Sequence, residues 1–234
     1  MGGEFDKASI ERAYARWAPI YDLVFGPVFE HGRRAAIRAA ERVGGRILEV
    51  GVGTGISLPY YARSSRLVGV DLSPPMLRKA QARVVEQGLT NVEALAVMDA
   101  ERLALPDRSF DVVVAQYVIT AVPHPEAILD EFARVIRPGG EIVLINHIGA
   151  EGGLRRLLEL CLAPLARRLG WRPEFRFRTL AEWAKRHGGV RVVERRPMPP
   201  LGHFSLIRFE RPAGGMPVPP PPGSPGGDPY VRPK

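Results

Sequence analysis

The sequence holds a single cysteine, Cys161, among its 234 residues. One thiol excludes an internal disulfide and any metal cluster held by cysteines, and it suits a reducing cytoplasm. Lysine is almost as scarce, because only four of the 33 basic residues are lysines and arginine carries most of the formal net charge of +8. A basic chain favours anionic partners, which include nucleic acids and acidic lipid headgroups.

Long apolar runs are also missing. The longest, Leu157 to Leu165, contains Glu159 and falls short of the roughly 20 residues that span a bilayer. No charged-then-apolar leader stands at the start of the chain. We therefore expect a cytoplasmic protein, either in solution or peripheral on the inner face of the membrane. No pair of histidines and carboxylates has metal-ligand spacing, so no metal is expected.

The chain divides into three parts. Residues 1–43 have a helical pattern broken near Pro19 and Gly26-Pro27, and we predict an N-terminal helical lid and membrane-contact segment there. Residues 44–211 have strand-like runs at 47–51, 67–71, 92–97, 110–116, 141–146, 190–196 and 203–209, with helices near 55–63, 74–87, 124–137 and 179–187. This alternation predicts an α/β fold, a mostly parallel seven-stranded sheet with helices on both faces. Residues 212–234 are mostly proline and glycine and should form an extended or disordered tail, either a docking peptide or a dispensable segment.

The most informative feature is the apolar run Ile47-Leu-Glu-Val, which leads into the alternating glycines Gly51, Gly53 and Gly55. Sixteen residues after Gly55, a second apolar run ends in Asp71. A strand, a Gly-rich turn, a helix and a carboxylate-tipped strand make a nucleoside-binding half of a Rossmann-like sheet, in which Asp71 accepts hydrogen bonds from ribose hydroxyls. The third glycine arrives one residue earlier than in the dinucleotide fingerprint, which favours S-adenosylmethionine over NAD.

Further motifs follow in a fixed order. The third strand closes with Asp99, residues 105–117 lead through the fourth strand to Gln116 and Tyr117, and residues 134–140 turn into the fifth. As a set, these motifs resemble the class I S-adenosylmethionine-dependent methyltransferases over about residues 1–150. The resemblance implies that S-adenosylmethionine is the cofactor and S-adenosylhomocysteine its product. It also implies the cofactor-binding residues Tyr14, Glu49, Gly51, Gly53, Gly55, Asp71, Leu72, Met76, Asp99, Ala100 and Gln116. Gly139-Gly140 is interpreted as a turn rather than a ligand contact.

The amino-terminal run from Tyr14 to Asp22 resembles the lid of lipid-quinone C-methyltransferases. It is also similar to that of bacterial phospholipid N-methyltransferases, which convert phosphatidylethanolamine to phosphatidylcholine. Trp17, the stretch 25–33 and Ile145-Asn146-His147 favour the phospholipid group. The resemblance then implies a phospholipid acceptor and an anionic membrane surface as partners. The candidate catalytic residues are Tyr21, Tyr117 and His147, and the candidate substrate-binding residues are Trp17, Tyr21, Asn146, His147, Arg178 and His203.

Several alternatives stay open. The main one is a C-methyltransferase acting on a ubiquinone or menaquinone precursor, and another is a cofactor-binding protein without catalysis. Nucleic-acid methylation is disfavoured, because no Asn-Pro-Pro-Tyr type motif or separate recognition domain is present, and no nucleic-acid partner is expected. The leucines between Leu157 and Leu162 either pack in the core or, with the seven arginines from Arg155 to Arg178, contact a membrane.

Overall fold

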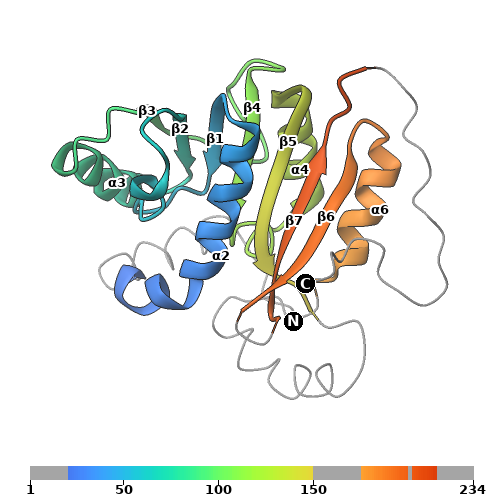
Figure 1. The fold of residues 1–234 in the computed structure, drawn as a ribbon, viewed down its shortest axis with the longest axis horizontal. Coiled ribbons are helices and arrows are strands. Elements are labelled where there is room, and N and C mark those ends of the chain that lie inside the picture. Colours follow the sequence, from blue (N-terminus) through green and yellow to red (C-terminus); the bar gives the residue numbers. More distant parts are fainter. Residues whose placement is uncertain (1–20, 150–174, 200–201, 215–234) are drawn as a thin grey trace.

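The computed structural model describes residues 21–149, 175–199 and 202–214, with side chains from Phe29 onward. One seven-stranded sheet has the strand order β3-β2-β1-β4-β5-β7-β6 (Figure 1). The strands are β1 (Arg46–Val50), β2 (Arg66–Asp71), β3 (Val92–Val97), β4 (Phe110–Gln116), β5 (Ile136–His147), β6 (Arg191–Met198) and β7 (Phe204–Glu210). The helices are α2 (Tyr21–Val43), α3 (Pro74–Glu86), α4 (Pro125–Val135) and α6 (Phe177–His187), with a short 3-10 turn η1 (Leu58–Tyr60). Strands β1 to β5 run parallel, and β7 and β6 are antiparallel to their neighbours, which confirms the predicted sheet.

Strands β4 and β5 each contain a continuous apolar run because helices cover both of their faces. Val112 and Val114 of β4 belong to the core on the side of α2, while Val113 and Ala115 belong to the core on the side of α4 and α6. Successive side chains of a strand point to opposite faces, so a strand covered on both sides has no solvent-facing position. This explains why the sequence shows continuous apolar runs here.

Helix α2 corrects part of the lid prediction. It is one helix from Tyr21 to Val43, without the complete break predicted near Gly26-Pro27, although Figure 1 shows its axis turning sharply between its first turns and the rest. Its second half is a core element, since Ala35, Ala36, Ala39 and Ala40 are all buried.

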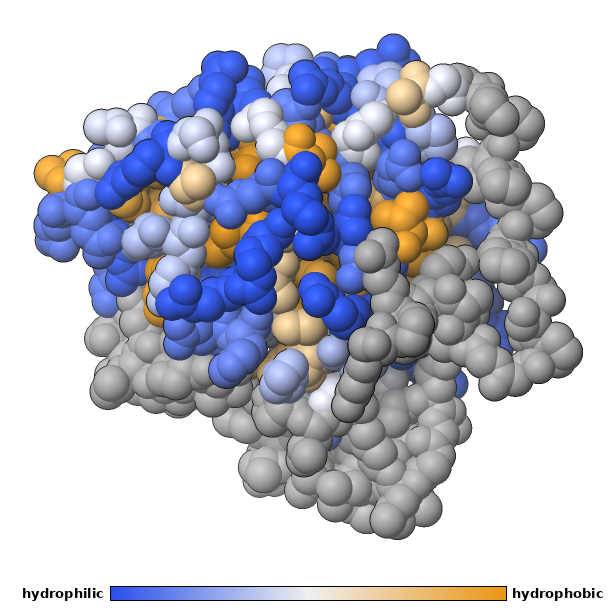
Figure 2. Space-filling view, in the orientation of Figure 1, coloured by the Kyte–Doolittle hydropathy of each residue, from blue (hydrophilic) through white to orange (hydrophobic). Residues whose placement is uncertain are grey.

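Some predictions lie outside the described residues. They are the lid over residues 1–20 with Tyr14 and Trp17, the side chain of Tyr21, the leucine and arginine segment before residue 175, and most of the tail. No helix in the described ranges is long and apolar enough to cross a bilayer. The face drawn in Figure 2 is mostly hydrophilic, with hydrophobic residues in small separate patches.

The structure differs from the sequence-based predictions at two local features, the helix at 55–63 and the turn at Gly139-Gly140. The helix expected at 55–63 is wrong, since only η1 forms; Gly55 is left-handed at φ +72, and Tyr61 is already extended. The interpretation of Gly139-Gly140 as a turn is wrong, because both glycines lie inside β5, where its register with β4 shifts. Gly139 has φ +83, and a Cβ on Gly140 would lie 2.6 Å from the carbonyl oxygen of Asp111. Both glycines precede the paired core of β5, at the edge opposite to the carboxyl ends of the parallel strands.

Candidate active site

A pocket opens at the edge where the carboxyl ends of the parallel strands meet, the usual ligand position in such sheets. The loops after β1, β2, β3 and β4 form it together with one face of α2. The lining includes Phe29, Arg33, Glu49, Gly51, Gly53, Thr54, Ser57, Asp71, Leu72, Met76, Asp99, Ala100, Gln116, Tyr117, Val118 and Val122. Nine of the eleven cofactor residues implied by the resemblance are among them.

Each of the three glycines in the turn after β1 has a structural reason. At Gly51 and Gly55 a side chain would collide with a neighbour, and at Gly53 the backbone conformation favours glycine. A Cβ on Gly51 would overlap the side chain of Val118, whereas Gly53 has open space but φ +56, a conformation that favours glycine. Gly55 is not among the residues that line the pocket, and its role as a ligand contact stays a prediction. A Cβ there would lie 3.0 Å from Ala80 of α3, so Gly55 allows the helix to approach the turn from behind.

Asp71 at the end of β2 is fixed by backbone donors. Its Oδ2 accepts a hydrogen bond from the Gly53 N–H at 2.8 Å, and its Oδ1 accepts one from the Ser73 N–H at 2.9 Å. Burial raises the pKa of Asp71, and these two backbone hydrogen bonds oppose the shift. The carboxylate therefore joins the Gly-rich turn to the start of α3 and keeps lone pairs directed at the pocket.

Asp99 follows β3 and organises a second tight turn. Its Oδ1 accepts a hydrogen bond from the Glu101 N–H at 3.0 Å, and its carbonyl oxygen accepts one from the Arg102 N–H at 3.0 Å. This turn holds Asp99 and Ala100 against the pocket beside Met76 and Leu72. Two apolar side chains and a polar edge make a suitable environment for an aromatic heterocycle.

Glu49 near the end of β1 is the most unusual charged group of the site. It is 2% exposed, and its Oε1 accepts hydrogen bonds from Ser57 Oγ at 2.5 Å and from Gln116 Nε2 at 3.2 Å. Its Oε2 has no hydrogen-bond partner. Burial raises the pKa of Glu49 to about 6, while the Ser57 hydrogen bond, the nearby Tyr61 hydroxyl and the positive charge of Arg33 oppose the shift. A buried carboxylate oxygen without a donor is expensive unless a ligand supplies one.

Tyr117 after β4 forms the wall of the pocket next to α2. It is one of two non-glycine residues with positive φ in the described ranges, at +63. Its N–H donates to the Ile145 carbonyl at 2.7 Å, and its hydroxyl donates to the Phe29 carbonyl at 3.0 Å. Its ring stacks on Phe29 with centroids 4.2 Å apart, and a Cβ on Gly32 would overlap the hydroxyl. Left-handed non-glycine residues concentrate at functional sites, where the surrounding contacts hold them.

Aromatic rings continue from Tyr117 to the histidines at the ends of β5 and β7. Phe204 lies edge-on to Tyr117 at 5.4 Å and to His147 at 6.3 Å, and His203 stacks on His147 at 6.0 Å. The structure thus brings together Tyr117, His147 and His203, three of the predicted acceptor-site residues, as a row that starts at the pocket.

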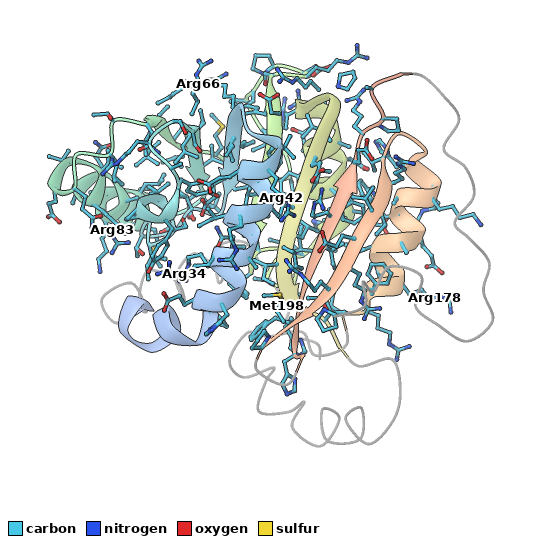
Figure 3. The ribbon with its side chains drawn as sticks, in the orientation of Figure 1. Arg34, Arg42, Arg66, Arg83, Arg178 and Met198 are labelled. Carbon is cyan, nitrogen blue, oxygen red and sulfur yellow. The ribbon has the colours of Figure 1, made fainter. Side chains whose placement is uncertain are left out.

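Two other predicted acceptor residues lie elsewhere. Asn146 is on the opposite face of β5 from His147, is 1% exposed, and neither polar atom of its side chain has a hydrogen-bond partner. Arg178 lies near the start of α6 (Figure 3), with its side chain 80% exposed and paired with Glu182 at 2.7 Å. Neither residue lines the pocket or belongs to the aromatic row, in which only Tyr117 lines the pocket itself.

Phe29, Arg33, Ser57 and the loop from Val118 to Val122 also line the pocket, although they were not predicted from the sequence. For Arg33 a signal was present. Helical spacing places Arg33 on the same face of the helix as Phe29, Ala36 and Ala40. An arginine on an apolar helix face is expected to be buried. Over residues 21–149, 175–199 and 202–214, no group of three or more His, Cys, Asp or Glu side chains is arranged to hold a metal ion.

Comparison with known proteins agrees with this geometry. A family described as Methyltransferase domain matches residues 48–144. A phosphatidylethanolamine N-methyltransferase from Cereibacter sphaeroides is 42% identical over 203 residues, which cover 87% of this chain and 98% of that protein. A demethylmenaquinone methyltransferase from Thermus thermophilus is 35% identical over 145 residues, which cover 57% of this chain and 63% of that protein.

Solved structures show the same fold. An N-methyltransferase from Haemonchus contortus, in complex with phosphomonomethylethanolamine and S-adenosylhomocysteine, has a TM-score of 0.66. It is 18% identical, and the match covers 87% of this chain and 60% of that one.

Proposed function

This chain belongs to the S-adenosylmethionine-dependent methyltransferases, and we propose that it methylates the amine of phosphatidylethanolamine and its methylated intermediates to give phosphatidylcholine. The observation that carries the proposal is the 42% identity to a phosphatidylethanolamine N-methyltransferase over 87% of the chain. We place the reaction at an anionic membrane surface on the cytoplasmic side. The net charge of +8 supports this location, because each basic residue near such a surface contributes about 1 kcal/mol of attraction.

The polar groups of the pocket match the hydrogen-bonding groups of S-adenosylmethionine. Asp71 presents an ionisable acceptor to the ribose hydroxyls, and the Asp99–Ala100 turn meets the edge of the adenine. The orphan Oε2 of Glu49 meets an amino group. When bound, S-adenosylmethionine supplies a methyl group on a positively charged sulfur, so the chain needs no nucleophile of its own.

We assign the acceptor to the aromatic row that begins at Tyr117. Ring faces stabilise a nitrogen that becomes a permanent cation as methyl groups are added. The amine must be neutral to react, so a group of the site has to remove its proton, and His147 is our candidate for that base. His203, stacked on His147, is our candidate for the phosphodiester.

The assay that tests this function uses labelled S-adenosylmethionine with vesicles of phosphatidylethanolamine and phosphatidylglycerol. We expect label in mono-, di- and trimethylated phospholipid. A parallel reaction offers a demethylated menaquinol, since one relative is a demethylmenaquinone methyltransferase. Label in the quinol and none in phospholipid would replace the proposed acceptor with the quinone alternative.

The histidine row yields a separate prediction. We expect His203→Gln to raise the KM for phosphatidylethanolamine by about tenfold, the value of one charge-assisted hydrogen bond, with kcat nearly unchanged. His147→Gln should instead lower kcat. The matched control is His187→Gln at the far end of α6, which should change neither value. If His147→Gln or His203→Gln weakened S-adenosylhomocysteine binding, that residue would belong to the cofactor site and not to the acceptor site.

A further inference from the structure

Two unfavourable residue choices meet at one contact beside the pocket. Gly32 lies inside α2, where glycine is a weaker helix former than any residue except proline. Tyr117 lies after β4 with φ +63, a conformation that glycine or asparagine adopts at a lower cost. The side chain of Tyr117 reaches α2 at the position of Gly32. Each choice lowers stability by itself, so the contact that joins them has to be explained.

Space, and not backbone conformation, requires glycine at position 32. Gly32 is helical and has no positive φ, unlike the three glycines of the turn after β1. A Cβ on Gly32 would overlap the hydroxyl oxygen of Tyr117 and would lie 2.8 Å from Cγ1 of Ile145. Helix α2 packs on β4 and β5 here (Figure 1), so the missing side chain leaves a space in the helix surface between Gly32, Tyr117 and Ile145. We call this space the Gly32 notch.

The notch decides which part of Tyr117 faces the pocket. Its hydroxyl donates to the carbonyl oxygen of Phe29 at 3.0 Å, so the proton is directed at the backbone of α2. Its ring stacks on Phe29 at 4.2 Å and lines the pocket. The hydroxyl therefore acts as an anchor, and the ring is what Tyr117 offers to a ligand. Contacts on several sides of a left-handed residue are what keep such a strained conformation populated.

We propose that Gly32 is a positioning residue of the acceptor site. It admits the Tyr117 hydroxyl into the surface of α2 and thereby fixes the Tyr117 ring where the aromatic row meets the pocket. This inference rests on the proposed acceptor site, in which ring faces stabilise the methylated nitrogen. A ring that is already held in place needs no ordering when the cation forms. A methyl group at position 32 would displace the hydroxyl and turn the ring away from that position.

Three variants test the assignment with the acceptor, phospholipid or menaquinol, that the unaltered protein methylates. We expect Gly32→Ala to lower kcat by about 10- to 100-fold, the effect of a small misplacement at a reacting centre, and to change S-adenosylhomocysteine affinity less than about threefold. Tyr117→Phe keeps the ring but loses the hydrogen bond to Phe29, so kcat should fall about fivefold. In the double variant the nearest clash is gone, because the ring atoms of Tyr117 would lie no closer than 3.2 Å to the added Cβ. Its kcat should return to within about threefold of that of Tyr117→Phe alone.

The control is Gly189→Ala after α6, where an added Cβ would lie 2.9 Å from a ring atom of His187, outside the pocket. This variant should change neither kcat nor S-adenosylhomocysteine binding. A double variant that loses the product of the two single effects would show that the space serves Ile145 alone, and this would overturn the assignment. A Gly32→Ala protein with an unchanged kcat would overturn it too.

The pH profile of kcat separates an anchoring hydroxyl from a reacting one, and it decides the matter if Gly32→Ala does not fold. For Tyr117→Phe we expect the same relative fall at every pH, because the hydroxyl takes no part in proton transfer. A profile that loses one limb would make the hydroxyl an acid or a base, and an unchanged kcat would leave it without an anchoring role. Either result overturns the assignment. Methylation of the quinol and not of phospholipid by the unaltered protein would reject the proposed function instead, and the ratios between variants would still test Gly32.

Discussion

Replacing Asp71 with alanine is expected to weaken S-adenosylhomocysteine binding by about 100-fold or more and to abolish measurable methyl transfer. Two effects combine. The ribose loses an ionisable acceptor, and the N–H groups of Gly53 and Ser73 lose the carboxylate oxygens that they bind at 2.8 and 2.9 Å. The Gly-rich turn is then no longer joined to α3, so the pocket loses its preorganised shape.

Titration calorimetry measures the affinity, and circular dichroism checks the fold. The control is Asp107→Asn, which removes the charge of an exposed side chain paired with Arg134 and should leave binding unchanged. An Asp71→Ala protein that binds S-adenosylhomocysteine within threefold of the unaltered protein would refute the assignment of Asp71 to the ribose.

The sequence could predict the sheet and the ends of its strands because that information is local. Burial on both faces makes β4 and β5 read as continuous apolar runs, and the acids at Asp71 and Asp99 mark where two strands end. Parallel strands bring these ends to one edge, so the part of the pocket that the strand ends supply followed from their order, whereas the part that α2 supplies did not.

Other features depended on packing that no local pattern carries. Gly55 has the same sequence signature as Gly51, but Gly55 packs against Ala80 of α3 whereas Gly51 lines the pocket. Arg33 and Arg34 are adjacent and identical, and only the phase of α2 on the sheet decides that the first is buried and the second exposed. Asn146 and His147 are likewise adjacent, and the strand puts them on opposite faces.

Strain and burial both concentrate where the pocket meets α2. Tyr117 holds a left-handed conformation through its contacts with Ile145 and Phe29, and Glu49 holds a carboxylate in a site that raises its pKa to about 6. Both features destabilise the protein without ligand and place groups where a ligand needs them. Active sites commonly combine function with local instability in this way.

The Glu49→Gln variant tests whether the buried charge of Glu49 lowers the stability of the protein without ligand. Burial raises the pKa of Glu49 from 4.5 to about 6, so the folded protein binds this proton more tightly than the unfolded chain does. The contribution of Glu49 to stability is therefore most favourable below pH 4.5 and is lost as the pH rises through 6. At pH 7.5 the ionised carboxylate costs about 2 kcal/mol, from a shift of about 1.5 pH units.

Glutamine keeps the oxygen that accepts from Ser57 and Gln116 and replaces only the orphan Oε2. Without ligand, we expect the variant to unfold in urea at pH 7.5 with a free energy about 1–2 kcal/mol above that of the unaltered protein, and the difference to shrink toward zero below pH 4.5. With saturating ligand this advantage is offset, because S-adenosylhomocysteine should bind at least tenfold more weakly, a loss of about 1.4 kcal/mol or more, once the charge facing its ammonium is gone. Glu126→Gln on α4, an exposed partner of Arg186, should change stability by less than about 0.5 kcal/mol at either pH. A Glu49→Gln protein that is less stable than the unaltered one at pH 7.5, or whose advantage persists in acid, would show that burial of the charge is not what destabilises this site.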